Sequence, residues 1–176
     1  LNAIGRKHTT AETQEKFLLA KEVGFDAINM DLIAGLPTDT VESFKNSINR
    51  AIELGADNIT VHTLALKRSS TIVTENESDS VTDKDIMEML DFAGETLTEN
   101  GYYPYYMYRQ SKSLGNLENV GWCKKDKECF YNVLMMEEYQ SIFSVGAGAV
   151  TKLRSEDGSV IERIFNFKYP FEYISR

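Results

Sequence analysis

The chain has 176 residues, of which 42% are hydrophobic and 26% are charged, and its formal net charge is -8. This size predicts one sizeable core, in one domain or a large piece of one. The sequence shows neither an apolar run near the roughly 20 residues of a membrane span nor a secretion signal, which favours a cytoplasmic protein without a membrane partner. The dispersed basic residues and the negative charge argue against a nucleic-acid partner.

A repeat of 31 residues organises the first part of the chain, because AKEVGFDAI from Ala20 matches AIELGADNI from Ala51. Each unit predicts a helix, a glycine stop and a buried strand. The first helix is predicted to begin near Thr9, with Glu12 completing a capping box, and to end at Gly24. The strand AINMDLI follows it. The chain opens on Leu rather than Met, and its first residues resemble the end of an element, so we expect a portion upstream.

The second helix is predicted to begin at Asp39 or Thr40 and to end at Gly55, before the strand NITVHTLAL. A polar, acidic loop over 67–80 comes next. A third amphipathic helix ends before Gly101, and YYPYYMY is predicted as the strand after it.

The alternation of helices and strands predicts an α/β fold with parallel strands, forming a barrel or half-barrel over residues 1–110. Residues 111–176 are expected to form an α+β carboxy-terminal elaboration. There, GNLENVGW is predicted as a loop, 131–141 as a helix, and 150–168 as a hairpin with a type I′ turn at Asp157-Gly158.

Candidate site residues lie near the carboxyl ends of the predicted strands, where parallel β/α folds bind ligands. Alternation puts Asn29, Asp31 and Ile33 on one face of the first strand. A carboxylate in an apolar strand is costly to bury alone, so Asp31 is expected to have a partner, either a structural protein group or a ligand hydroxyl or ammonium. His62 is either a hydrogen-bonded core residue or a ligand or base.

Other candidates carry weaker signals. Arg109 ends a predicted strand and suits an anionic ligand, whereas Lys67 and Arg68 are more simply solvated surface charges. Ala65 is small enough for a flat ring to approach the backbone, although tight packing explains it equally. The glycines of SVGAGAV favour close backbone packing over a phosphate site, because the dinucleotide spacing is absent.

The two cysteines predict no metal site. Cys123 and Cys129 are too few for a disulfide framework and too widely spaced for a C-x2-C knuckle, so ordinary reduced thiols are expected.

Six segments in order resemble the oxygen-independent coproporphyrinogen III oxidase family of the radical S-adenosylmethionine superfamily. They are IGRKHT, NMDLIAGLPTDT with a following ESF, ITVHTLALK, YYMYRQ, GNLENVGW and GAGA. The resemblance implies part of an incomplete (βα) barrel, and an oxidoreductase that decarboxylates porphyrinogen propionates to vinyl groups in haem biosynthesis. It also implies S-adenosylmethionine and a [4Fe-4S] cluster as cofactors.

The same resemblance assigns roles to three residues. Arg6 would contact the carboxylate of S-adenosylmethionine, Asp31 would accept from its ribose hydroxyls, and Ala65 would contact the adenosyl portion through the backbone. Arg109 is the candidate for the porphyrinogen substrate. The family's C-x3-C-x2-C cluster motif does not occur in this sequence, so the chain is expected to be an inactive carboxy-terminal fragment that holds no cluster.

Two other functions, and self-association of the chain, are also compatible with the sequence. A haem-binding chaperone of the same superfamily shares much of this signature, and a non-catalytic β/α interaction fragment is the other alternative. If strands are missing upstream, the edge of AINMDLI and the apolar residues Phe17, Leu18 and Val23 would be uncovered, which predicts self-association through that edge. The alternative is a monomer in which the hairpin over 150–168 covers the edge.

Overall fold

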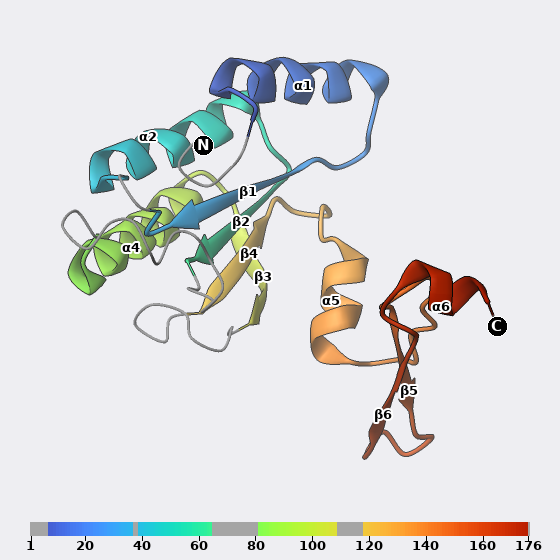
Figure 1. Ribbon diagram of the computed structural model, residues 1–176. Coiled ribbons are helices and arrows are strands. Elements are labelled where there is room, and N and C mark those ends of the chain that lie inside the picture. The colour runs from blue at the N-terminus through green and yellow to red at the C-terminus, as the bar shows by residue number, and fades with distance from the viewer. Residues whose placement is uncertain (1–6, 37–38, 65–80, 109–117, 176) are drawn as a thin grey trace. The chain divides into compact units, whose positions relative to one another are not determined.

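The computed structural model describes residues 7–36, 39–64, 81–108 and 118–175 (Figure 1). The chain divides into two compact units, Leu1–Glu128 and Cys129–Arg176.

Three helices of the first unit begin and end where local sequence signals place them. Each begins with a capping box, in which a threonine N-cap and the residue three positions later satisfy each other's backbone donors. Gly24 and Gly55 end the first two helices at φ values of 90° and 74°, a conformation that glycine adopts without strain. The predicted boundaries are confirmed for α1 (Thr10–Val23), α2 (Val41–Leu54) and α4 (Asp83–Glu99).

Four strands form one sheet in the order β1-β2-β4-β3. The predicted parallel pairing of the first two strands is confirmed, and the third predicted strand is present. The fourth strand is antiparallel to both of its neighbours and separates β2 from β3. The strands are β1 (Asn29–Ala34), β2 (Asn58–Thr63), β3 (Tyr103–Tyr108) and β4 (Asn119–Cys123).

The prediction that GNLENVGW is a loop is wrong over residues 119–122, which belong to β4. Glycine and asparagine are typical of turns, but here they occupy alternate positions of a strand. Trp122 packs against the hydrophobic core, whereas Gly121 lies on the other face and opposite Tyr106.

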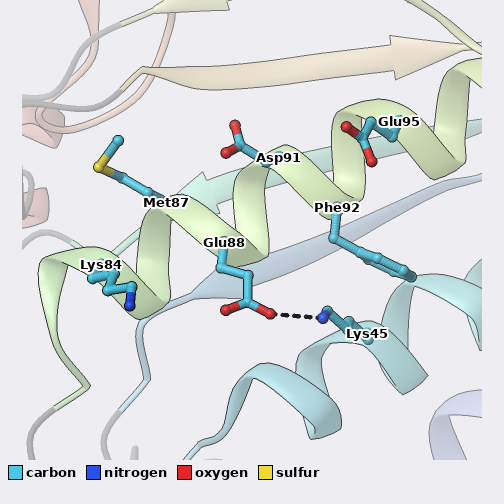
Figure 2. Close-up of a pocket in the computed structure, with 7 residues that line it drawn as sticks. All are labelled: Lys45, Lys84, Met87, Glu88, Asp91, Phe92 and Glu95. Carbon is cyan, nitrogen blue, oxygen red and sulfur yellow. Dashed lines mark hydrogen bonds and ion pairs between the residues drawn. The ribbon is translucent and has the colours of Figure 1, made fainter.

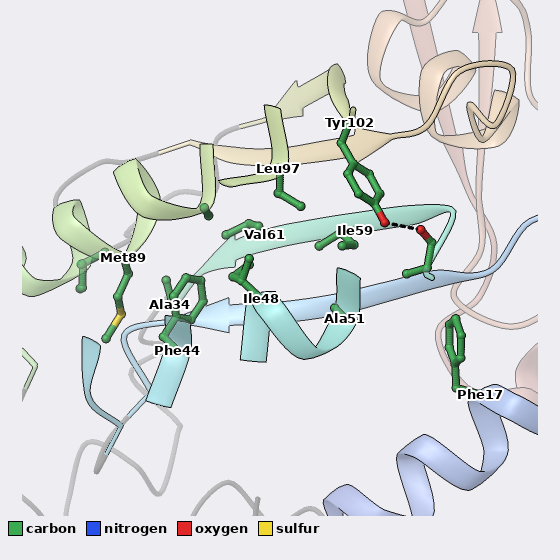
Figure 3. Close-up of a cluster of buried hydrophobic side chains, with 13 residues drawn as sticks. Phe17, Ala34, Phe44, Ile48, Ala51, Ile59, Val61, Met89, Leu97 and Tyr102 are labelled. Atoms are coloured by element: carbon green, nitrogen blue, oxygen red, sulfur yellow. Dashed lines mark hydrogen bonds between the residues drawn. The ribbon is translucent and has the colours of Figure 1, made fainter. Parts of the chain in front are cut away.

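The core lies on the face of the sheet that α2 and α4 cover (Figure 3). Phe44 and Ile48 from α2 meet Ile59 and Val61 from β2, and α4 adds a row of buried side chains at helical spacing. Tyr102 is also buried, and its hydroxyl donates a 2.6 Å hydrogen bond to the carbonyl oxygen of Ala56. Burial raises the pKa of Tyr102 to about 12.

The first strand lies at one edge of the described sheet, and the carboxy-terminal strands pair with each other in a sheet of their own. Leu18 and Val23 of α1 are exposed as predicted, but Phe17 is buried, so the expectation that Phe17 is uncovered is wrong. Phe17 packs with the core residues instead. Self-association through the β1 edge stays a prediction.

The second unit contains α5 (Phe130–Glu137), β5 (Val150–Arg154), β6 (Ile161–Phe165) and α6 (Pro170–Ile174). The predicted hairpin is confirmed, because β5 and β6 pair in antiparallel register. Its turn is not type I′, since that type needs two successive positive φ values and of the Asp157-Gly158 pair only Gly158 has one. The predicted helix over 131–141 ends earlier, at Glu137.

The glycines of SVGAGAV serve backbone conformation and not close packing. Gly146 and Gly148 have φ values of 105° and 72°, which other residues rarely adopt. A side-chain carbon at Gly146 would meet no atom within 4 Å, and one at Gly148 would make only an ordinary contact with Lys168. The prediction of close packing is therefore wrong.

Candidate functional site

The face of the sheet opposite the hydrophobic core carries a set of polar side chains. Alternation along each strand and the pairing register place them together, because paired residues share a face. The set, which we call the Asp31 network, consists of Asn29, Asp31, Thr60, His62, Tyr106 and Tyr108.

Asp31 lies at the centre of this network. Its Oδ1 accepts a 2.7 Å hydrogen bond from Asn29 Nδ2 and lies 3.5 Å from His62 Nε2. The hydrogen bond from His62 contributes most to holding the pKa of Asp31 below its ordinary value, and partial burial opposes this effect. Asp31 is therefore ionised at neutral pH, and its carboxylate can act as a hydrogen-bond acceptor.

The expected cost of burying Asp31 does not arise, because 62% of its side chain is exposed. The expectation that it has a partner is confirmed by Asn29 and His62. The alternating face predicted for Asn29, Asp31 and Ile33 is also what the register shows.

His62 bridges two strands that are not neighbours in the sheet. Its Nδ1 lies 3.0 Å from the hydroxyl of Tyr108 on β3, across the intervening strand β4. The two rings meet edge to face, with centroids 6.2 Å apart. His62 is thus hydrogen-bonded, as one of its two interpretations requires, and it also contacts the candidate cofactor residue.

The remaining members connect β3 to Asn29. The Thr60 hydroxyl lies 3.3 Å from that of Tyr106 and donates a 3.1 Å hydrogen bond to Asn29 Oδ1. Gly121 makes room for the Tyr106 ring, because a side-chain carbon at this position would lie 1.8 Å from a ring atom. A glycine in β4 is therefore required for the tyrosine to reach β2.

The pairing of Asp31 with His62 is the functional feature that sequence reasoning missed. Its signal was present, since the two residues occupy equivalent positions of the 31-residue repeat and so face the same side of adjacent strands. The register pairs Asp31 with Thr60, two residues before His62, which is the stagger expected of tilted strands in a barrel. Tyr108 could not have been placed without knowing that β4 lies between β2 and β3.

Three of the four predicted site residues, Arg6, Ala65 and Arg109, lie outside the described residues, as do Lys67 and Arg68. Whether Arg6 and Asp31 share one concavity stays a prediction.

A groove on the outer helix layer is separate from this network (Figure 2). Lys45 of α2 forms a 2.8 Å ion pair with Glu88 of α4, and its ammonium lies over the Phe92 ring. Because α2 and α4 cover the opposite face of the sheet, the groove does not contain Asp31. Its residues are Lys45, Lys84, Met87, Glu88, Asp91, Phe92 and Glu95.

The described residues do not fit an iron–sulfur cluster. Among them, no group of three or more His, Cys, Asp or Glu side chains could hold a metal ion. Cys123 is buried, and burial raises the pKa of its thiol to about 11, which disfavours the thiolate that a cluster requires. Of the helices in the described ranges, none has the length and apolar character to cross a membrane.

Comparisons with known proteins identify relatives of this chain. The chain matches no protein-family model. It is 41% identical over 177 residues to the oxygen-independent coproporphyrinogen-III oxidase-like protein HemZ of Bacillus subtilis, covering 100% of this chain and 35% of that protein. This chain is homologous to the oxygen-independent coproporphyrinogen III oxidase family.

A heme chaperone is also among the relatives of this chain. The heme chaperone HemW of Haemophilus influenzae is 27% identical over 174 residues, which is 99% of this chain and 42% of that protein. The chain thus spans less than half the length of these relatives.

The fold agrees with this homology. Coproporphyrinogen III oxidase (HemN) from Escherichia coli, described as a radical SAM enzyme, has a TM-score of 0.67 and 20% identity, with 96% of this chain and 38% of that chain covered. The predicted α/β fold of the radical S-adenosylmethionine type is therefore confirmed for the region that this chain represents.

Proposed function

We propose that this chain forms the nucleoside-binding part of a radical S-adenosylmethionine oxidoreductase that acts like an oxygen-independent coproporphyrinogen III oxidase. The observation that carries the proposal is the Asp31 network, with its exposed carboxylate, on the face of the sheet opposite the core, in a chain that is homologous to that family throughout. When bound, S-adenosylmethionine and a [4Fe-4S] cluster would supply the radical that starts decarboxylation of a porphyrinogen propionate.

Asp31 fits a ligand with hydroxyl groups. Its contacts with Asn29 and His62 both use Oδ1, and 62% of the side chain is exposed, so the carboxylate is accessible to a ligand. A carboxylate only accepts, so a ribose diol is a suitable donor. On the same face, Asn119 Nδ2 is buried without a partner among the described residues, which leaves a donor for an acceptor on a ligand or a neighbouring segment.

The remaining roles follow the family resemblance. Arg6 would bind the carboxylate of S-adenosylmethionine through its guanidinium, Ala65 would contact the adenosyl group, and Arg109 would bind a substrate propionate. The cluster ligands are proposed to lie outside this sequence, because its two cysteines do not form the family's motif. The chain alone is proposed to be inactive.

Binding of S-adenosylmethionine to the complete gene product tests the proposal. Asp31→Asn is expected to weaken binding about tenfold, since it removes the charge from a charge-assisted acceptor. Asp91→Asn on the outer face of α4 is the matched control and should leave affinity unchanged. Equal affinity of the Asp31 variant and the unaltered protein would contradict the proposed site.

A haem-binding chaperone is the second candidate, and the similarity to HemW over nearly the whole chain favours it. The complete gene product should be assayed anaerobically for vinyl formation from a porphyrinogen and titrated with haem. Turnover supports the oxidase, whereas stoichiometric haem binding without turnover supports the chaperone.

A further inference from the structure

His62 is held between an acceptor and a hydroxyl. Its side chain is 25% exposed, compared with 62% for Asp31. Nε2 lies 3.5 Å from Asp31 Oδ1, and Nδ1 lies 3.0 Å from the Tyr108 hydroxyl. The less exposed His62 is therefore placed to restrict the position of the more exposed Asp31.

The chemistry of the two partners selects one tautomer of the neutral imidazole. A carboxylate can only accept a hydrogen bond, so Nε2 must carry the proton that points to Asp31. Nδ1 is then an acceptor and takes the hydrogen of the Tyr108 hydroxyl. Second partners of this kind commonly fix the orientation of a histidine that acts on another group.

Tyr108 reaches His62 because of the strand order. It is on β3, and β4 lies between β3 and β2. Its ring is parallel to that of Tyr106, with an interplanar angle of 3° and centroids 6.3 Å apart, and Tyr106 occupies the space that Gly121 leaves open. Tyr108 is thus held against Tyr106, and its hydroxyl is in a fixed position to contact the His62 imidazole.

An exposed aspartate without neighbours would sample several rotamers and would lose that freedom when it bound a ligand. Here Asn29 of β1 and His62 of β2 both contact Oδ1, which restricts the rotamers of the Asp31 side chain. Fixing an acceptor before the ligand arrives improves its affinity and its selectivity for a matching donor.

We propose that His62, oriented by Tyr108, is a positioning residue that fixes Asp31 so that its carboxylate recognises the vicinal hydroxyls of a ribose. This inference rests on the proposed function of Asp31 and adds the residues that give the carboxylate its selectivity. His62 acts through Asp31 and does not itself touch the ligand.

Two nucleosides that differ only in these hydroxyls test the inference. The full chain is titrated with adenosine and with 2′,3′-dideoxyadenosine, and the ratio of the two affinities is measured by NMR. The unaltered chain is expected to prefer adenosine by about tenfold, the value of a hydrogen bond to a charged group. His62→Phe should reduce this preference at least threefold, because Asp31 then loses the hydrogen bond from the imidazole.

His62→Gln is the conservative variant, since its amide can donate to Asp31 and accept from Tyr108. It should retain most of the preference for adenosine. In an Asp31→Asn background, His62→Phe should cause no further loss of preference. Damage to the fold alone would weaken both nucleosides equally and leave their ratio unchanged.

The state of the imidazole is read independently of any ligand. When the His62 ring is neutral, nitrogen NMR is expected to show its proton on Nε2, and Tyr108→Phe should increase the Nδ1-protonated tautomer. A neutral ring with its proton on Nδ1 in the unaltered chain would overturn the inference.

The outcomes separate the two proposals. If Asp31→Asn removes the preference for adenosine and His62→Phe does not, the inference fails and the site stands. If the unaltered chain shows no preference, the proposed function of Asp31 fails and the inference fails with it. If His62→Phe and Asp31→Asn each remove the preference and His62→Gln retains it, the inference holds.

Discussion

The two faces of the four-stranded sheet share the same strands but differ in what covers them. On one face, α2 and α4 bury a continuous set of apolar side chains. On the other, the same strands present the Asp31 network, in which every member has a hydrogen-bonding partner from another residue of the set. Alternate residues of one strand thus lie in the hydrophobic core or in the proposed recognition site.

This difference predicts how substitutions divide. Changes on the covered face should alter the free energy of unfolding and leave ligand selectivity intact, whereas changes in the network should do the reverse. Four predictions test this division, beginning with the largest expected effect.

Met89→Ala tests the covered face. The Met89 side chain is fully buried in α4, and removing it leaves a cavity, so the free energy of unfolding should fall by about 2–5 kcal/mol. Met87→Ala, in the same helix at a side chain that is 54% exposed, is the matched control and should change stability by less than about 0.5 kcal/mol. Urea unfolding followed by circular dichroism measures both. Equal effects would mean that the core does not lie between α4 and the sheet.

The covered face was also the part that the sequence predicted best. Apolar spacing identified α4 as an amphipathic helix, and the predicted threonine caps with Gly24 and Gly55 identified the boundaries of α1 and α2. These signals come from residues that are close to one another in sequence. The alternation of side chains along a strand also predicted which face of β1 carries Asp31.

The face that carries the Asp31 network was predicted less completely, because its contacts join residues far apart in the chain. Gly121 and Asn119 looked like turn residues, and only the pairing of β4 with β2 and β3 shows them as strand residues. The partner of His62 depended on the same pairing. Local signals cannot reveal a strand that inserts between two others.

Gly121→Ala tests the residue that allows the network to form. The added carbon would overlap the Tyr106 ring, which must move, and stability should fall by about 1–3 kcal/mol. Gly94→Ala is the matched control, because its added carbon meets Trp122 at an ordinary 3.9 Å and replaces glycine within a helix. That variant should gain about 0.5–1 kcal/mol. A loss in both variants, measured by urea unfolding, would contradict the packing of Tyr106 over Gly121.

Tyr102→Phe tests the polar group that the covered face does contain. Without the hydroxyl, the buried carbonyl of Ala56 loses its side-chain donor, so stability should fall by about 1 kcal/mol. Because the pKa of Tyr102 is raised to about 12 in the folded state, its contribution is complete below the ordinary tyrosine value and is lost as pH rises toward 12. The unaltered chain should therefore lose stability between about pH 10 and 12, and Tyr102→Phe should lose less over that range. Parallel pH dependence in the two proteins would contradict this assignment.

The smallest effect on stability is expected at Asp31, because its side chain is exposed whereas those of the covered face are buried. Its folded-state pKa lies below the ordinary value, so its contribution is present above that value and is lost as pH falls through the folded pKa. Because the side chain is 62% exposed, solvent screening should keep this contribution below about 1 kcal/mol.

His62→Phe should raise the pKa of Asp31 toward its ordinary value, since the hydrogen bond from His62 is the largest cause of the lowered pKa. Carbon NMR of the Asp31 carboxyl measures this pKa directly, and His62→Gln should preserve part of the lowering. If His62→Phe left the pKa of Asp31 unchanged but lowered the free energy of unfolding as much as Met89→Ala, His62 would belong to the stabilising core and the division between the two faces would be wrong.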